Sequence, residues 1–438
     1  MRFGIGRRDI TPPFYTHMHG YAGRKDTYDR INDPLTLTAV VLEEGKNRAL
    51  LAAADICTFP NDGTLSELLA KVGKAVGCAP DNVMLNASHT HGGPRLPSPS
   101  LYWAGFRAST ADQYRDFLYC EVLEAANEAV DNLADGSLWF GEGKTQLPMN
   151  RRPEREGGVA NAPNPGGPVD NRLHLLALKK ATGELAGVGM RISCHPVATG
   201  AQHAITADFP GAWRAAFSDT FGPDVVPFFL QGSGADARPH HVREEDHWRA
   251  MKHGELSVIG DELMAEMMAV LTSTALREVE DLTLIGKINV AHAPCEKRYT
   301  SRKQLKPLAD AGGLQQQYAE ACLGRLDRGE KIPDHVDFHV QTLWLNRELA
   351  LIGLDVEPLC GLGSIVESAV APKTGVLLGY NSGCIGYTPD SHEMMRGGYE
   401  TNSYLPSVWC GPLLPGLERL FADAVVRRPP ARRRGAKR

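Results

Sequence analysis

The sequence predicts an α/β protein built from mixed β-sheets that are flanked by helices. Short apolar runs alternate along the chain with segments whose apolar residues recur at helical spacing, which is the order typical of α/β architecture. Two apolar runs within residues 173–196 are separated only by the turn-forming residues Ala-Thr-Gly-Glu, so part of the sheet is predicted to be antiparallel. Polar residues gather where the apolar strands stop.

The expected elements follow in chain order. They are a strand at 48–56, a helix at 64–77, a strand at 82–91, a helix at 112–133, the strand pair within 173–196, a strand at 225–236, a helix at 254–274, a strand at 281–291, and an antiparallel pair at 336–345 and 348–357. Residues 150–172 are rich in Pro, Gly and Asn and are expected to form a long surface loop. Long ordered loops in compact domains often line a functional site.

Composition limits the class of protein. The 438 residues are 42% hydrophobic and 23% charged, near the globular average, which excludes collagen-like and highly charged chains. We expect one domain over residues 1–425, followed by a basic, disordered tail over 426–438. A net charge of -5 gives no general attraction to nucleic acid, and no apolar run is long enough for a membrane span. A homo-oligomer is left open.

Cysteine usage and the N-terminus bear on the compartment. The nine cysteines are an odd number without a CxxC pair, which argues against a disulfide framework and against a thiolate zinc site. Residues 1–13 lack the apolar centre of a signal peptide. A reducing compartment and a cytoplasmic location are therefore expected.

A pair of histidines ends the third expected element. In an extended strand, side chains two positions apart share a face, so His89 and His91 in "NASHTHGGP" could share a metal, or act as one ligand and one proton carrier. Taken alone, the pattern is equally compatible with a polar strand end. His195 in "RISCHPVATG" also ends an apolar strand, where a hydrogen-bonded structural role is the alternative.

Carboxylates end another apolar strand. Asp355 and Glu357 in "LALIGLDVEP" need a cation, because an unpaired buried carboxylate costs several kcal/mol. Two or three imidazoles with one carboxylate match the ligand set of a catalytic zinc. Asp208 in "ITADFPGAW" is most simply a helix N-cap followed by a first-turn proline.

Two Gly-rich stretches contain further candidate site residues. "GYTPDSHEMMRGGYE" contains Tyr387 and Tyr399, whose rings could be structural or functional. "LQGSGADARPHHV" contains Asp236, Arg238 and His240, and it lacks the Lys-Ser/Thr of a phosphate-binding P-loop.

Five segments in this order resemble the catalytic domain of the neutral/alkaline (non-lysosomal) ceramidase family, from about residue 3 to about residue 420. The segments are "GIGRRDITPP" with "GYAGR", "SHTHGGP", "CHPVATG" with "TADFPG", the Gly-rich turn "ADARPH", and "GYTPDSHEMMRGGYE". The resemblance implies the fold of that domain, with a metal site at strand ends, and a zinc amidase that cleaves an N-acyl bond.

The resemblance also implies site residues by matched position. His89, His195 and Tyr387 fall on metal ligands, and Asp355 takes the place of the family's glutamate ligand, with Glu357 as the alternative. His91 matches a residue beside the metal, where it is expected to carry protons. Arg151 and Tyr399 match residues that hold the substrate or its oxyanion. Zn²⁺ is the expected metal, with Mn²⁺ and Fe²⁺ as alternatives.

The Gly-rich turn departs from the family pattern. Family members read "GDVSPN", whereas this chain reads "ADARPH", so Asp236 is kept and Arg238 replaces a serine proposed to be essential. Because arginine binds carboxylate or phosphate as a fork, Arg238, with Asp236 and His240, is expected to bind a small polar or anionic substrate. The expected function is a zinc-dependent amide hydrolase. The alternatives are a lactonase or esterase acting on a small sugar acid, and a metal-binding homologue without activity.

Overall fold

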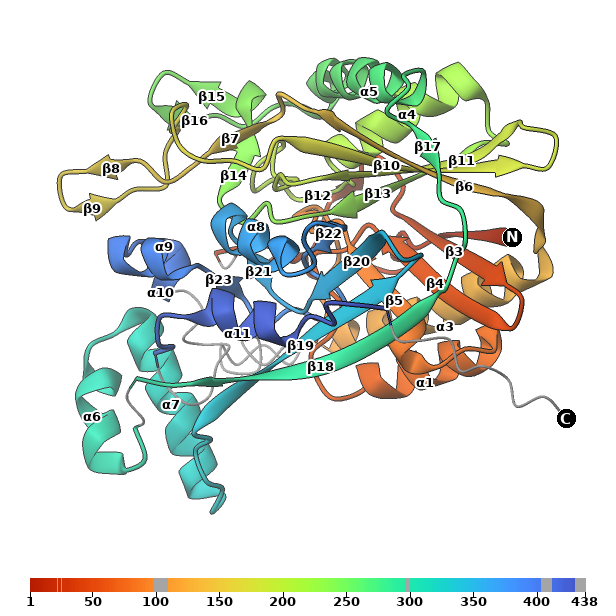
Figure 1. Cartoon of the computed structure of the whole chain (residues 1–438). Coiled ribbons are helices and arrows are strands. Elements are labelled where there is room, and N and C mark those ends of the chain that lie inside the picture. Colours follow the sequence, from red (N-terminus) through yellow and green to blue (C-terminus); the bar gives the residue numbers. More distant parts are fainter. Residues whose placement is uncertain (22, 25, 98–108, 297–298, 403–411, 430–438) are drawn as a thin grey trace, which may run out of the picture.

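The computed structural model describes residues 1–429 except 22, 25, 98–108, 297–298 and 403–411. Residues 430–438, most of the expected basic tail, lie outside this description. Two β-sheets with helices on their outer faces make up most of the described chain, which confirms the predicted α/β class (Figure 1).

The larger sheet is mixed. Its strands run in the order β13-β11-β10-β6-β1-β3-β4-β5, with β17 added beside β6. The pairs β11/β13 and β4/β5 are parallel, and the remaining pairs are antiparallel. The strands are β1 (Arg2–Asp9), β3 (Thr36–Glu44), β4 (Asn47–Ala54), β5 (Val83–Ala87), β6 (Ala134–Lys144), β10 (Arg172–Lys180), β11 (Leu185–Ile192), β13 (Val226–Gln231) and β17 (Arg277–Glu278).

The second sheet has the order β18-β19-β20-β22, with only β20/β22 parallel. Its strands are β18 (Ile285–Pro294), β19 (His335–Trp344), β20 (Leu349–Leu354) and β22 (Thr374–Leu378). The predicted antiparallel pairs β10/β11 and β19/β20 are both confirmed.

Helices cover the outer faces of the sheets (Figure 1). In that view α4 and α5 lie above the larger sheet, α1 and α3 lie below its other end, and α8 and α11 lie on the second sheet, while α6 and α7 form a separate pair. Their bounds are α1 Leu65–Val76, α3 Ser109–Asp131, α4 Phe209–Phe221, α5 Ser257–Leu271, α6 Arg302–Asp310, α7 Gly313–Asp327, α8 Cys360–Ser368 and α11 Leu417–Ala424. None of the described helices is both long and apolar enough to cross a lipid bilayer.

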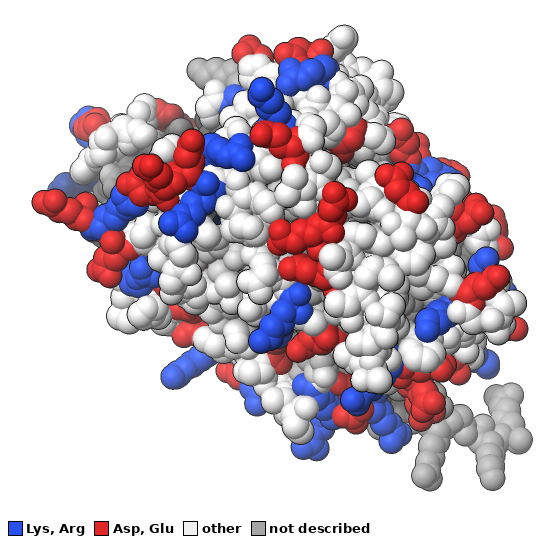
Figure 2. Space-filling model, turned by 90° about the horizontal axis from the view of Figure 1, so that it is seen from above, with Lys and Arg blue, Asp and Glu red and all other residues white. Residues whose placement is uncertain are grey.

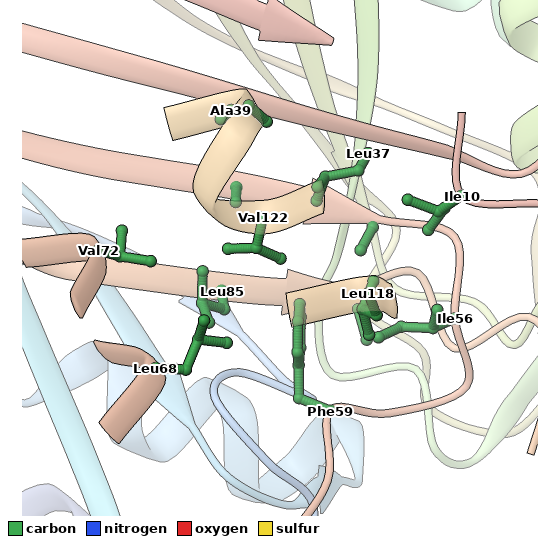
Figure 3. Close-up of a cluster of buried hydrophobic side chains, with 14 of the residues drawn as sticks. Ile10, Leu37, Ala39, Ile56, Phe59, Leu68, Val72, Leu85, Leu118 and Val122 are labelled. Atoms are coloured by element: carbon green, nitrogen blue, oxygen red, sulfur yellow. The ribbon is translucent and has the colours of Figure 1, made fainter. Parts of the chain in front are cut away.

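One apolar core lies between α1, α3 and the strands β3 to β5. Leu68 and Val72 of α1, with Leu118 and Val122 of α3, pack near Leu85 of β5 (Figure 3). The one-sided apolar spacing of these helices buries the stripe that the sequence predicts. Burial of this stripe fixes β5, whose C-terminal end leads to His89.

A buried charge cluster joins the two sheets. Asp170 accepts from Arg191 of β11 (2.6 Å), and the Arg191 Nε donates to the Leu377 carbonyl of β22 (2.9 Å). The Leu377 N–H donates in turn to Glu367 of α8 (2.8 Å). These bonds set the ends of β11 and β22 at a fixed distance, and both ends carry residues of the site described below.

Several expected boundaries differ in detail. β5 ends at Ala87, so His89 and His91 lie beyond the strand rather than on it. Residues 150–172 are mainly loop, as expected, with a small hairpin of β8 (Glu154–Arg155) and β9 (Gly158–Val159). Asp208 caps α4 as predicted, because its carboxylate accepts from the Phe209 N–H at 2.8 Å.

Seven of the described cysteines are free thiols, and Cys295 is disulfide-bonded. The charge distribution matches the composition: in Figure 2, which views the face carrying α4 and α5, basic and acidic side chains are interspersed.

Candidate metal centre

The candidate centre lies where parallel strands end. His195 follows β11, the segment of His89 and His91 follows β5, and Glu357 follows β20 in the short strand β21 (Glu357–Pro358). The C-terminal ends of parallel strands are the usual position of sites in α/β sheets, because loops from separate strands converge there. Residues more than 250 positions apart in the sequence thereby meet.

Three side chains converge on one point. The Oε2 atom of Glu357 lies 3.2 Å from His89 Nε2 and 3.5 Å from His195 Nε2. Each histidine is oriented by its other ring nitrogen: Nδ1 of His89 donates to the Cys57 carbonyl (2.7 Å), and Nδ1 of His195 donates to the Gly234 carbonyl (2.7 Å). Backbone acceptors at Nδ1 leave both Nε2 lone pairs directed at the carboxylate, which is the usual arrangement behind metal-binding histidines.

This geometry fits a divalent cation. The two Nε2 atoms and a Glu357 oxygen lie within 4.8 Å of one another, and the Oε2 atom is buried without a hydrogen-bond partner of good geometry among the described residues. Burial disfavours charge on His89, but Cys57 and Glu357 raise its pKa to about 10. Burial alone would raise the pKa of Glu357, yet His89 and His195 hold it well below its usual range. The cluster therefore favours a positive charge beside the Glu357 carboxylate, and a bound divalent cation would supply that charge.

The backbone around His89 departs from the extended strand that the sequence suggested. His89 has φ +66°, and Tyr380, which follows β22, has φ +52°. Their rings stack with centroids 4.1 Å apart. The left-handed conformation costs a non-glycine residue about 1–3 kcal/mol and persists only where the surroundings hold it. The turn at His89 directs its ring toward Glu357. His89 is therefore positioned by a turn and not by the face of an extended strand.

The carboxylate in the cluster is Glu357, not Asp355. Asp355 accepts from the backbone N–H of His339 (3.0 Å) and from its Nδ1 (2.8 Å), so its oxygens point to β19. The two carboxylates do not share a face because β20 ends at Leu354 and the chain bends before β21 begins. Asp355 is thereby corrected as a candidate ligand, and Glu357, the alternative from the sequence, takes its place.

Tyr387 is held beside the cluster by strand pairing. It lies in β23 (Tyr387–Thr388), where it pairs in register with Glu357 of β21. Its hydroxyl lies 3.4 Å from His195 Nε2 and accepts from Arg151 Nη2 at 3.1 Å. Burial raises the pKa of Tyr387 well above its usual value, with Glu357 adding to this shift and Arg151 opposing it. Its hydroxyl could therefore serve as a further donor to a cation bound by His89, His195 and Glu357.

Arg151 and Tyr399 flank Tyr387. The Arg151 Nε donates to Glu400 Oε1 (2.9 Å), and Glu400 also pairs with Arg152. Arg152 in turn donates to Glu393 Oε2 (2.7 Å). Tyr399 begins the short helix α10 (Tyr399–Asn402); its side chain is 53% exposed, and its ring centroid lies 5.5 Å from that of Tyr387. Both predicted residues therefore lie next to the cluster, Arg151 buried and Tyr399 at the solvent side.

His91 lies against His89 and faces the N-terminal loop. Its Nε2 is 3.2 Å from His89 Nε2, and its ring meets Tyr21 edge-on at 4.8 Å. Arg24 donates to the His91 carbonyl at 2.6 Å. Gly20 has φ +97° and a Cβ there would lie 2.3 Å from the His91 ring, so only glycine fits. Burial, with His89 and His195 nearby, holds the pKa of His91 well below its usual value.

The side chains of the Gly-rich turn after β13 lie in different surroundings. Asp236 is buried and accepts from the Cys360 N–H (3.1 Å), and burial raises its pKa to about 6. Arg238, in β14 (Ala237–Pro239), lies near enough to Arg151, Tyr21 and Tyr387 for their charges to act on its pKa, which burial lowers. His240 turns the other way: its Nδ1 donates to the Gln146 carbonyl (3.0 Å) and its ring lies 3.9 Å from that of His241. The structure thus places Arg238 near the cluster and His240 in a separate group.

Some residues near the site were not predicted from the sequence. His19 lies close enough to His89 and Glu357 for their charges to affect its pKa, which burial lowers to about 3. Cys57 and Tyr380 support His89 through a carbonyl and a ring. Their contacts depend on loops whose course the sequence does not reveal. Only the spacing of His17 and His19 could have suggested a second pair of imidazoles.

Comparison with known proteins gives relatives of one kind. No protein-family model matches the chain. The neutral ceramidase of Pseudomonas aeruginosa is 28% identical over 254 residues, which are 55% of this chain and 37% of that protein. The neutral ceramidase of Drosophila pseudoobscura pseudoobscura is 29% identical over 161 residues, 35% of this chain and 22% of that protein. The matched segments thus span well under half of these relatives.

Solved structures cover more of the chain. The crystal structure of neutral ceramidase from Pseudomonas aeruginosa aligns with a TM-score of 0.69 over 97% of this chain and 73% of its own, at 19% identity. A ceramidase complexed with C2 aligns with a TM-score of 0.70 over the same shares. At this identity the alignment establishes a shared fold.

Proposed function

We propose, from the premise that this chain is a divergent relative of the neutral ceramidases, that it is a metal-dependent hydrolase of the amide (N-acyl) bond of a small polar or anionic substrate. The observation that carries the proposal is the convergence of His89 Nε2 and His195 Nε2 on the Glu357 carboxylate, with the Tyr387 hydroxyl beside them. Two imidazoles, a carboxylate and a phenol suit Zn²⁺, and Mn²⁺ and Fe²⁺ are alternatives.

The residues of the chain divide the chemical work. A divalent cation, when bound, supplies Lewis-acid polarisation and activation of water. The Nε2 atom of His91 is directed at the cluster, so His91 would accept a proton from the attacking water and return it to the leaving nitrogen. Arg151 fixes the Tyr387 hydroxyl, and Tyr399 stands at the solvent side, where its hydroxyl can donate to the oxyanion. No serine is needed in this scheme, which agrees with arginine at position 238.

Arg238 supports the choice of a polar or anionic substrate. Its guanidinium is largely withdrawn from water, and its Nε is buried without a hydrogen-bond partner among the described residues. The Trp248 ring lies 5.4 Å from its guanidinium carbon. Burial lowers the pKa of Arg238 and the charge of Arg151 lowers it further, so an anion bound to the Arg238 guanidinium would stabilise its charged form. A carboxylate or phosphate on the substrate would supply that anion.

A substrate panel tests the function directly. The purified protein, loaded with Zn²⁺, would be assayed on N-acyl amides with neutral, carboxylate and phosphate groups, on short and long acyl chains, and on lactones and esters. We expect amide hydrolysis that a chelator abolishes and Zn²⁺ restores. Turnover of lactones or esters alone would favour the lactonase or esterase alternative, and bound zinc without any turnover would favour a homologue without activity.

The substitution Arg238→Ser restores the residue type of the family pattern and removes the positive charge at this position. We expect KM for an anionic substrate to rise about 10- to 100-fold with kcat little changed, because a charged hydrogen bond contributes about 1.5–3 kcal/mol. Steady-state kinetics on matched anionic and neutral amides measures the difference. Arg243→Ser, which removes an exposed arginine from the same segment, serves as the control. Equal KM changes for both substrates would contradict an anion-binding role.

The cytoplasmic location also stays a proposal.

A further inference from the structure

A second cluster of potential metal ligands lies on the α5 side of the larger sheet. His240 and His241 lie in the short 3₁₀ helix η2 (His240–Val242), and Glu262 lies in α5. The ligand atoms of these three residues lie within 4.8 Å of one another. Nε2 of His241 lies 3.0 Å from Glu262 Oε2. Two imidazoles and one carboxylate from two separate elements therefore converge, as they do in zinc sites.

His240 is oriented as a metal-binding histidine would be. Its Nδ1 donates to the Gln146 carbonyl (3.0 Å), so its Nε2 carries the free lone pair. The N–H of Gln146 donates to Glu266 Oε1 at 2.7 Å, and Glu266 lies one turn beyond Glu262 on the same face of α5. The backbone of one residue, Gln146, thus links the imidazole to a second carboxylate. Hydrogen bonds of this kind fix the tautomer and direction of a ligand.

Three polar atoms of the cluster lack partners in the described part of the chain. His241 Nδ1, Glu262 Oε1 and Glu266 Oε2 are each buried and have no hydrogen bond. Buried polar atoms are nearly always satisfied, so unsatisfied ones in one place point to a missing water or ion.

We propose that His240, His241 and Glu262 bind a second divalent cation of the zinc type, separate from the cluster at His89. The site would tie η2, which directly follows the strand of Arg238, to α5. The Arg238 strand already pairs with β7 (Pro148–Asn150), which leads to Arg151. A cation at this position would therefore be structural, holding the segment that carries Arg238 against the helix layer.

Metal content of single variants tests the proposal. Purified full-length protein is saturated with Zn²⁺ and freed of excess by gel filtration, and zinc per chain is measured by mass spectrometry. We expect two equivalents in the unchanged protein and the loss of one in His241→Ala and in Glu262→Gln. His89→Ala is expected to lose the other one, and the combination His89→Ala/His241→Ala is expected to lose both. His247→Ala, an exposed histidine of the same segment, should keep both.

The outcomes separate the two sites. If His241→Ala and Glu262→Gln bind as much zinc as the unchanged protein, the second site is overturned, whatever His89→Ala does. If the unchanged protein binds one equivalent and only His241→Ala loses it, the second site stands and the cluster at His89 fails. A stability readout covers variants that fold poorly: Zn²⁺ should raise the thermal midpoint of His89→Ala but not of His89→Ala/His241→Ala.

Discussion

We expect His89→Ala and Glu357→Gln to lose the bound cation of the first site together with at least about 10³-fold of kcat/KM. The reason is that each removes one of the donors that converge on a single point, and the electrostatic help of a catalytic metal is worth several kcal/mol, at about 1.4 kcal/mol per tenfold. Metal content and steady-state rates on the best substrate of the panel, measured on the same samples, check the expectation.

The matched control for Glu357→Gln is Asp355→Asn. Asp355 lies two positions away and is also buried, but its carboxylate is bonded to His339. We therefore expect Asp355→Asn to keep the zinc of the first site. The reverse pattern, with metal lost in Asp355→Asn and kept in Glu357→Gln, would contradict the ligand set proposed here. Circular dichroism separates loss of the ligand from loss of the fold.

The second large effect is expected from Arg152→Met. Arg152 is fully buried and is the partner of Glu393, Glu400 and the Gly397 carbonyl. Removing one member of a buried ion network leaves uncompensated carboxylates and costs about 3–5 kcal/mol. We expect the free energy of unfolding in urea to fall by that amount. The rate should fall as well, because Glu400 also holds Arg151 beside Tyr387.

Arg155→Met is the control for this substitution. Arg155 lies three positions further along and pairs with Asp246 at 3.3 Å, but 42% and 71% of their side chains are exposed. Exposed pairs of this kind contribute about 0–1 kcal/mol, so the unfolding midpoint should hardly move. Similar shifts in the two variants would mean that the network around Arg152 does not hold the site together.

Patterns along the chain predict local structure because that structure depends on near neighbours. Periodic apolar residues predicted α1 and α3, and the turn at residues 181–184 predicted the hairpin of β10 and β11. The N-cap at Asp208 depends only on the residues that follow it. The candidate residues at strand ends were predicted in the same way, because polar residues after an apolar strand are a local feature. His89 and His195 were found on that basis together with the family resemblance, and Tyr387 was assigned through the resemblance.

Other features could be decided only by the folded chain. The choice of Glu357 over Asp355 depends on the bend between β20 and β21 and on His339, a residue of another strand. His240 was expected beside the substrate, but η2 turns it toward α5, where Glu262 and Glu266 lie. His19 approaches the cluster through a loop from the N-terminus.

The sequence alone therefore determined the fold class and most elements, because apolar periodicity is encoded within about ten to twenty residues. The proposed donors His89, His195 and Tyr387 were assigned through the family resemblance. Tertiary structure alone decided which carboxylate completes the set, which imidazoles face it and which way the turn at His89 points. Those outcomes depend on packing and hydrogen bonds between segments far apart in the chain, such as the bonds from His89 to Cys57 and from Asp355 to His339. A pattern read along one segment contains no information about the partner that another segment will bring.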